Sequence, residues 1–220
     1  MLPEDAGAII IWNDIAPEGR EDFYAWHLHE HIPERLSVPG FLRGSRYIAT
    51  SAETTPEFLT LYETMNADVA TSAPYLARLN APTAWTRSAT SHFRNTSRAL
   101  TRTVLDFGCG LGGVVGTIRF DGSTVGEERC RAAASSASDL SAAARLPRIS
   151  RVRLFLTNLA ASSERTAESR DRSDIRAAPS GAIMIEGCDE AAVNAAVNSL
   201  RLKPDAACAP GLYRLEHQLF

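Results

Sequence analysis

The sequence contains few cysteines, and their spacing excludes two classes of small, cysteine-dependent fold. The four cysteines, Cys109, Cys130, Cys188 and Cys208, lie far apart and form no Cys-x-x-Cys pair. That spacing fits neither a zinc-binding knuckle nor a small disulfide-stabilised scaffold. We therefore expect reduced and mostly buried thiols, as is typical of a cytoplasmic protein.

Long apolar segments and an excess of positive charge are also absent. The longest purely apolar run, residues 8–12, is far shorter than the roughly 20 residues that a membrane-spanning helix needs. Residues 1–7 contain Glu4 and Asp5 where a secretory signal would carry positive charge. The formal net charge is −3, and the arginines are scattered among acids instead of forming a block. These features predict a soluble protein whose partner is neither a membrane nor a nucleic acid.

What the sequence does contain is a globular composition. Hydrophobic residues make up 45% and charged residues 22% of the 220 residues, enough for one core or for two halves of about 110 residues. In the first half, apolar and alternating runs predict strands at residues 7–15, 41–49, 57–65 and 99–107. Helical spacing predicts helices at 19–31, from an N-cap at Asp68 to residue 79, and at 82–90. Pro33 should break or kink the first helix near Ile32, with a turn to Val38.

The second half repeats this order of elements. Strands are predicted at 111–120, 149–159, 182–187 and 212–219, and helices at 123–146 and 189–200. Two pairs of segments are also similar in sequence: VPGFLRGSRYIAT from Val38 resembles LPRISRVRLFLTN from Leu146, and FLTLYETMNADVATS from Phe58 resembles GAIMIEGCDEAAVNA from Gly181. The sequence therefore predicts an α+β fold of two tandem ferredoxin-like βαββαβ units, residues 1–108 and 109–220.

A polar segment, residues 161–179, interrupts the repeat. It is charged and poor in apolar residues, and it stands where the first half has only a short connection. We expect a mobile surface loop there, and the alternative is a lid over a pocket.

One segment of the first half carries a family resemblance. Its residues are Phe23, Trp26, the pair Glu30-His31, the run Pro33-Glu34-Arg35-Leu36, the run Val38-Pro39-Gly40-Phe41 and the pair Arg46-Tyr47. They resemble the W…EH…PERL…PGF…RY pattern of dimeric α/β-barrel proteins related to the EthD-like group. The resemblance implies two ferredoxin-like sheets that pair into a barrel, within one molecule for a tandem chain, and a homo-oligomer. It implies no single reaction, because related barrels include cyclases, isomerases, oxygenases, haem enzymes and proteins with no known activity.

The same segment supplies the candidate site residues. His27 and His31 are four residues apart and should share one helix face, with Glu30 adjacent. On a face turned toward the sheet, an imidazole beside a carboxylate can exchange a proton near neutral pH, and His31 is the first candidate. The other predicted roles are Glu30 as the group that orients an imidazole, Arg35 and Arg46 as holders of a substrate oxyanion, and Trp12, Trp26 and Tyr47 as apolar walls.

Purely structural roles are the alternative for these residues. A histidine beside a helix break can be a capping group, and Arg35 can pair with Glu30 or Glu34 on the surface. His29, on the opposite side of the helix, should be solvated. We predict no metal, because His-Leu-His-Glu-His is not the His-Glu-x-x-His arrangement and a third ligand would have to come from elsewhere. We also predict no haem or other cofactor, since no position matches an axial ligand of the haem-binding relatives.

The middle of the chain suggests a competing function. Residues 104–112, VLDFGCGLG, resemble motif I of S-adenosylmethionine-dependent methyltransferases, but that fold needs a helix after the glycines and residues 114–120 predict a strand. The preferred function is binding of a small apolar or aromatic molecule, with its cofactor-independent transformation by an isomerase-, cyclase- or oxygenase-like reaction. The alternatives are a non-catalytic binding or structural module and, third, a methyltransferase.

Overall fold

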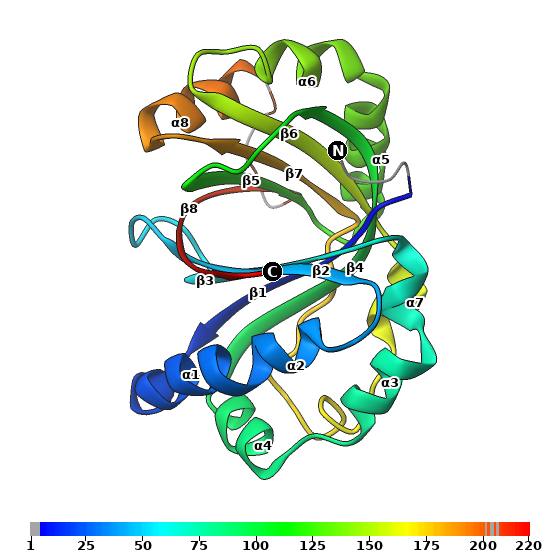
Figure 1. The fold of residues 1–220 in the computed structure, drawn as a ribbon. Helices are drawn as coiled ribbons and strands as arrows, with labels where there is room; N and C mark the ends of the chain where they lie inside the picture. Colours follow the sequence, from blue (N-terminus) through cyan, green and yellow to red (C-terminus); the bar gives the residue numbers. More distant parts are fainter. Residues whose placement is uncertain (1–4, 201, 203–204, 206) are drawn as a thin grey trace.

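The described residues form eight antiparallel strands that close into a barrel (Figure 1). The structure, a computed structural model, describes residues 5–200, 202, 205 and 207–220. The strands are β1 (Gly7–Ile15), β2 (Phe41–Ala49), β3 (Phe58–Thr64), β4 (Phe93–Gly108), β5 (Val114–Phe120), β6 (Ile149–Thr157), β7 (Gly181–Gly187) and β8 (Cys208–Leu219). Their order around the barrel is β1-β3-β2-β8-β5-β7-β6-β4. The predicted α+β class and the predicted barrel are confirmed.

Each half of the chain contributes four neighbouring strands to the barrel. The first half supplies β4-β1-β3-β2 and the second supplies β6-β7-β5-β8, and the antiparallel pairs β4–β6 and β2–β8 join them. The barrel therefore leaves no free sheet edge among the described strands. β1 is central in the first set, with Ile10 opposite Leu61 of β3 on one side and Ala99 of β4 on the other.

The position of β1 explains why its sequence is almost continuously apolar. Ala8, Ile10 and Trp12 point into the barrel, where they pack with side chains from both halves. Ile9 points outward and packs against the helices. Because successive side chains alternate between two covered faces, both sets of positions must be hydrophobic.

Helices cover the outer face of each four-stranded set. The first set is covered by α1 (Arg20–Trp26), the π-helix η2 (His27–His31), α2 (Ile32–Leu36), α3 (Ala73–Asn80) and α4 (Ala84–Ser91), with short 3-10 helices at η1 (Pro17–Gly19) and η3 (Ala67–Thr71). The second set is covered by α5 (Thr124–Ser135), α6 (Ala137–Ala143) and α8 (Glu190–Ser199), while α7 (Leu159–Ser163) follows β6. Figure 1 shows the two helical layers at opposite ends of the molecule, with the barrel between them.

The barrel interior combines an apolar layer with a buried ionic cluster. Trp12 and Tyr47 belong to the apolar layer. The guanidinium of Arg153, which is fully buried, donates to the carboxylate of Glu63 at 2.5 Å and to that of Glu186 at 2.6 Å. Charges at such a depth are stable only when they are paired and hydrogen-bonded, so these three residues tie β3, β6 and β7 together.

Of the break or kink predicted at Pro33, the break does not occur, and helix replaces the first part of the predicted turn. Residues His27–His31 form a π-helical turn, in which the N–H of Ile32 donates to the carbonyl of His27. Pro33 then occupies the first turn of α2, where its missing N–H leaves no helical hydrogen bond broken. The helical run therefore continues to Leu36.

Two other helix predictions are corrected at short polar side chains. Asn66 and Ser72, instead of Asp68, accept the capping hydrogen bonds of η3 and α3, so the helix that was predicted from residue 68 begins at residue 73. The predicted helix 123–146 is divided at Ser136 into α5 and α6. Short polar side chains at these positions compete for backbone groups and end one helix where the next begins.

The glycine-rich connection from β4 to β5 overturns the methyltransferase alternative. A strand follows the glycines, and every strand pairing in the described barrel is antiparallel, whereas the methyltransferase fold needs a helix there and a parallel sheet. Gly108 and Gly110 adopt φ values of 95° and 85°, which glycine tolerates best. Cys109 in this connection is exposed, as is Cys188 after β7, so the thiols are not mostly buried as predicted.

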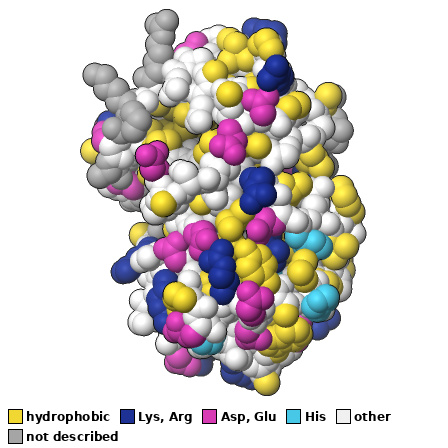
Figure 2. Space-filling model, turned by 90° about the vertical axis from the view of Figure 1, so that its left-hand side faces the viewer, with side chains coloured by type: hydrophobic (Ala, Val, Ile, Leu, Met, Phe, Trp, Pro, Cys, Tyr) yellow, Lys and Arg dark blue, Asp and Glu magenta, His cyan; other side chains and the backbone are white. Residues whose placement is uncertain are grey.

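Charges of both signs are mixed on the face of the molecule that Figure 2 presents. Acidic and basic side chains alternate there with apolar ones, without a block of either sign. Among the described residues, no helix is both long and apolar enough to cross a membrane.

Candidate functional site

A pocket of about 380 Å³ lies between the outer face of the first four strands and the helices that cover them. Its side chains come from β1, β3, β4, η2, α2 and α3, and they include Ile11, His31, Arg35, Tyr62, Tyr75 and Arg98. Residues 159–178 of the second half form its outer wall. The volume lies within the range of small-ligand pockets, and the lining combines apolar rings with a few polar groups.

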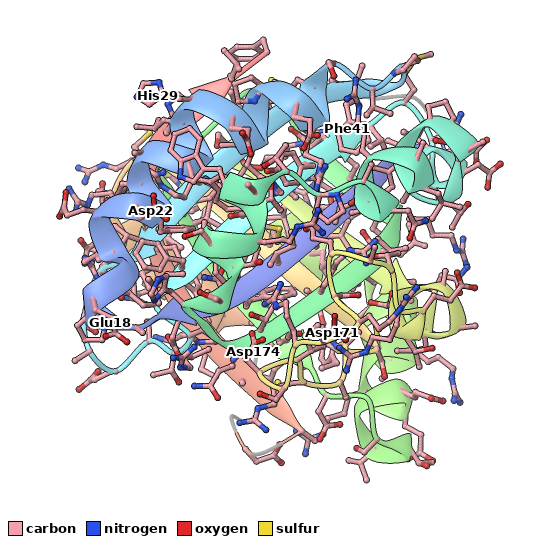
Figure 3. The ribbon with its side chains drawn as sticks, turned by 90° about the horizontal axis from the view of Figure 1, so that it is seen from below. Glu18, Asp22, His29, Phe41, Asp171 and Asp174 are labelled. Atoms are coloured by element: carbon pink, nitrogen blue, oxygen red, sulfur yellow. The ribbon has the colours of Figure 1, made fainter. Side chains whose placement is uncertain are left out.

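The outer wall is the polar segment that the sequence predicted as a surface loop. We call residues 159–178 the strap. The backbone N–H of Thr96 on β4 donates to the carbonyl of Asp174, and the N–H of Arg176 donates to the carbonyl of Thr96. Figure 3, in which Asp171 and Asp174 mark the strap, shows it passing beside β4. The segment therefore completes a pocket of the first half.

Two buried polar groups line this pocket without a protein partner. His31 is 6% exposed and Tyr62 is 1% exposed. His31 Nδ1 and the Tyr62 hydroxyl have no hydrogen-bond partner within the part of the chain that the structure describes. The two rings meet edge to face, with centroids 6.2 Å apart. A buried polar atom left unsatisfied costs about 1–3 kcal/mol, so these two side chains bring unsatisfied hydrogen-bonding capacity to the pocket wall.

Burial sets the protonation state of both groups. Burial, and then the positive charge of Arg35, lowers the pKa of His31 well below its ordinary value of 6.5, so the imidazole is neutral at pH 7. Burial also raises the pKa of Tyr62, so the phenol keeps its proton. The pocket thus presents a neutral imidazole and a phenolic donor side by side.

Trp26 and Glu30 fix the position of His31. The rings of Trp26 and His31 pack with centroids 4.1 Å apart. The indole N–H of Trp26 donates to the Glu30 carboxylate and to the Thr86 hydroxyl, both at 3.2 Å. Glu30 also accepts from the Thr83 hydroxyl at 2.6 Å. Its carboxylate therefore anchors η2 to α4 and acts on His31 through Trp26, without a direct hydrogen bond to an imidazole among the described residues.

His27 shares a face with His31, as the four-residue spacing predicted, but it lies outside the pocket wall. The two rings stack with centroids 5.5 Å apart. Burial, then Arg46 and His217, lower the pKa of His27. Arg46 donates to Glu216 at 3.2 Å and lies beside His27 instead of lining the pocket. Within residues 5–200, 202, 205 and 207–220, no group of three or more His, Cys, Asp or Glu side chains is arranged to hold a metal ion.

Arg35 lines the pocket but is paired with carboxylates. It donates to Glu34 at 2.9 Å and to Glu168 of the strap at 2.5 Å, and its guanidinium carbon lies 5.8 Å from the ring centre of Tyr75. Burial opposes the charged form, but Glu168 and the other acidic neighbours raise the pKa of Arg35 above its ordinary value. Arg35 therefore stays charged and links α2 to the strap.

Trp12 and Tyr47 lie on the other side of the sheet. Both point into the barrel interior, whereas Ile11 lines the pocket. Side chains alternate along a strand, so the neighbour of Ile11 in the chain cannot share its pocket. The prediction that Trp12 and Tyr47 share a pocket with His31 is therefore incorrect. Trp26 packs against the ring of His31.

The sequence analysis missed Tyr62, Tyr75 and Arg98. Tyr62 belongs to the strand that was predicted at 57–65, and the alternation along that strand was the signal that could have placed it on one face of the sheet. Arg98 lies one residue before the predicted start of β4, which begins earlier than its apolar run. His29 is exposed, as predicted, and Figure 3 shows it pointing away from the molecule.

Comparisons with known proteins identify the fold. No protein-family model and no curated protein matches the sequence. Among solved structures, an anthrone oxidase-like protein is similar with a TM-score of 0.59 and 9% identity, over 99% of this chain and 93% of that one. A mutant chlorite dismutase from Candidatus Nitrospira defluvii is similar with a TM-score of 0.53 and 7% identity, over 97% of this chain and 92% of that one. A candidate monooxygenase from Fusobacterium nucleatum is similar with a TM-score of 0.50 and 7% identity, over 98% of this chain and 95% of that one. Each similarity extends over nearly the whole of both chains, and at such identities it shows a shared fold alone.

Proposed function

We propose that this chain is a cofactor-independent enzyme that binds a small apolar or aromatic molecule in the pocket and moves a proton on it. The observation that supports this most strongly is the pair of buried polar atoms, His31 Nδ1 and the Tyr62 hydroxyl, which lack protein partners in the pocket wall. Most buried polar groups in native proteins have a hydrogen-bond partner, so two unsatisfied groups on neighbouring rings in the wall of one cavity support a functional site there.

The proposed step is general-base catalysis by His31. The lone pair of the neutral imidazole takes a proton from an acidic C–H or O–H group of the substrate. An N–H bond forms, the C–H or O–H bond breaks, and the electron pair stays on the substrate as a delocalised anion. Tyr62 donates a hydrogen bond to the developing oxyanion, and the nearby guanidinium of Arg35 adds positive charge. The anion in turn stabilises the imidazolium and raises the pKa of His31.

Isotope exchange tests this step without requiring the final product. Anthrone is a suitable first probe, because it is an aromatic ketone with an acidic methylene group and one structural neighbour is named for an anthrone oxidase. In anaerobic D₂O, the protein should accelerate exchange of the methylene protons, measured by NMR. The His31→Gln variant should lose about 10²–10⁴-fold of that rate. His29→Gln, a matched variant of an exposed histidine in the same π-helical turn, should keep it.

Two outcomes separate the alternatives, and a melting-temperature control accompanies them. An equal loss of rate in both histidine variants would contradict a role for His31 in the chemistry. Binding of anthrone without accelerated exchange would favour a non-catalytic binding module. The melting temperature of each variant should stay within about 2 °C of the wild type, so that a loss of rate is not a loss of fold.

We also propose that residues 1–108 and 109–220 are tandem ferredoxin-like units of EthD-like type. The matching strand orders support this: β4-β1-β3-β2 in the first half and β8-β5-β7-β6 in the second have the fourth, first, third and second strand of each half side by side. We infer a cytoplasmic homo-oligomer that associates through its helical layers, since both sheet edges are used within the barrel. Light scattering of the purified protein, with a mass above that of one chain, would support this assembly.

A further inference from the structure

The pocket wall carries an excess of positive charge. Five arginines and two glutamates line it, on a chain whose formal net charge is −3. Two of these arginines are paired: Arg35 with Glu34 and Glu168, and Arg172 with Asp174. Even when the carboxylates of Glu34 and Asp174 are counted with the lining, one positive charge remains in excess. The pocket is therefore a cationic site in an acidic protein.

Arg98 differs from the other arginines because it lies on the floor of the pocket without an ionic partner. It stands on the outer face of β4, opposite Ile11 of β1, and its guanidinium carbon lies 5.9 Å from the ring centre of Tyr75. It forms no ion pair with any carboxylate that the structure describes, and its Nε is buried without a hydrogen-bond partner. Arg165 and Arg176, by contrast, are exposed at the pocket rim.

A half-buried guanidinium without a counter-ion favours the binding of an anion. Part of its hydration has been removed, and no protein carboxylate compensates for that loss. Its planar fork matches the two oxygens of a carboxylate, which can accept two parallel hydrogen bonds. His31 and Tyr62 line the same pocket, and His31 Nδ1 and the Tyr62 hydroxyl have no hydrogen-bond partner among the described residues. Ile11 and Tyr75 add apolar surface to the pocket wall.

We propose that the ligand of this pocket is a small aromatic carboxylate, and that Arg98 binds its carboxylate group. This inference rests on the proposed function, because it concerns the same pocket, and it narrows the substrate class from apolar or aromatic molecules to aromatic acids. The hydroxyl or carbonyl group of the ligand then lies at His31 and Tyr62, and its ring lies against Tyr75.

A pair of probes that differ in one group tests this assignment. We would measure the affinity of the full chain for 1-hydroxy-2-naphthoate and for 1-naphthol by fluorescence titration. The wild type should bind the carboxylate about 10- to 100-fold more tightly, as expected for a charge-assisted pair. Arg98→Gln should abolish this preference, so that the variant binds the two probes with affinities within about twofold of each other. Arg102→Gln removes the same charge from an exposed position four residues along the same strand, and it should change neither affinity.

The outcomes distinguish this inference from the proposed function. Equal wild-type affinity for the two probes would overturn the role of Arg98 while leaving the pocket a small-molecule site. A preference that persists in Arg98→Gln would overturn it as well. Binding of neither probe would contradict the proposed function and the inference together. Arg98→Lys keeps the charge without the fork, so partial retention of the preference there would support recognition of an anion.

Discussion

Replacing Arg153 with methionine is expected to destabilise the barrel by about 3–5 kcal/mol. Arg153 is fully buried between Glu63 and Glu186, at 2.5 Å and 2.6 Å. Without it, Glu63 keeps two other cations, Arg43 and, at 3.9 Å, Arg151, whereas the Glu186 carboxylate keeps a single hydrogen bond from the described residues, that of the Gly112 backbone N–H at 3.4 Å. A carboxylate that stays buried without a compensating charge accounts for most of the expected cost.

Urea unfolding of matched variants measures this cost. For a chain of this length, the loss corresponds to a fall in melting temperature of roughly 6–20 °C. The double variant Arg153→Met/Glu186→Gln should recover most of the lost stability, because it also removes the uncompensated carboxylate. Arg131→Met is the surface control: Arg131 and Glu127 are 69% and 41% exposed, so its effect should stay within about 0.5 kcal/mol.

Two results would refute this reasoning. A loss below about 1 kcal/mol for Arg153→Met would mean that water or rearrangement compensates Glu186. A double variant as unstable as the sum of its two single variants would mean that Arg153 and Glu186 are not energetically coupled.

Two further predictions concern the stability of the protein at acidic pH and the attachment of the strap. The folded-state pKa values of His27 and His31 are depressed by burial, so below pH 6.5 the unfolded chain binds more protons and the free energy of unfolding falls, by up to about 1.4 kcal/mol per pH unit for each histidine. Urea titrations between pH 7.5 and 5 should show a shallower slope for His31→Gln, and identical slopes would contradict a buried neutral His31. Glu168→Gln removes the ion pair of the strap with Arg35 and should speed tryptic cleavage within residues 161–179 about tenfold, whereas Glu164→Gln, at an exposed position, should not. Unchanged cleavage in Glu168→Gln would mean that this pair does not hold the strap.

Strands were predictable because their signals are local. The structure places β1 and β2 at residues 7–15 and 41–49, the ranges that the sequence predicted. Each run of apolar residues ends at polar residues or proline, and the alternation along β3 fixes one face of that strand. The helices of the second half were harder to predict. Ser136 ends α5 inside an alanine-rich stretch that contains no proline or glycine to mark the end of the helix.

The pocket was only partly predictable because its geometry depends on non-local contacts. Both faces of β1 are apolar, so the sequence could not say that Ile11 faces the helices while Trp12 faces the barrel. The Thr96 hydroxyl bonds to Asp174 across 78 residues of sequence, which no local pattern encodes. The π-helical turn that contains His31 and leads directly into α2 also has no sequence signal of its own.

The most direct test of the pocket is histidine side-chain NMR during a titration with 1-naphthol. The sequence contains five histidines, so each imidazole can be assigned from single variants. We expect the resonances of His31 to be those of a neutral ring at pH 7 and to shift on saturation, while those of the exposed His29 stay unchanged. Saturable binding that leaves the His31 resonances unmoved, or that shifts only the exposed ring, would contradict the assignment of this pocket as the functional site.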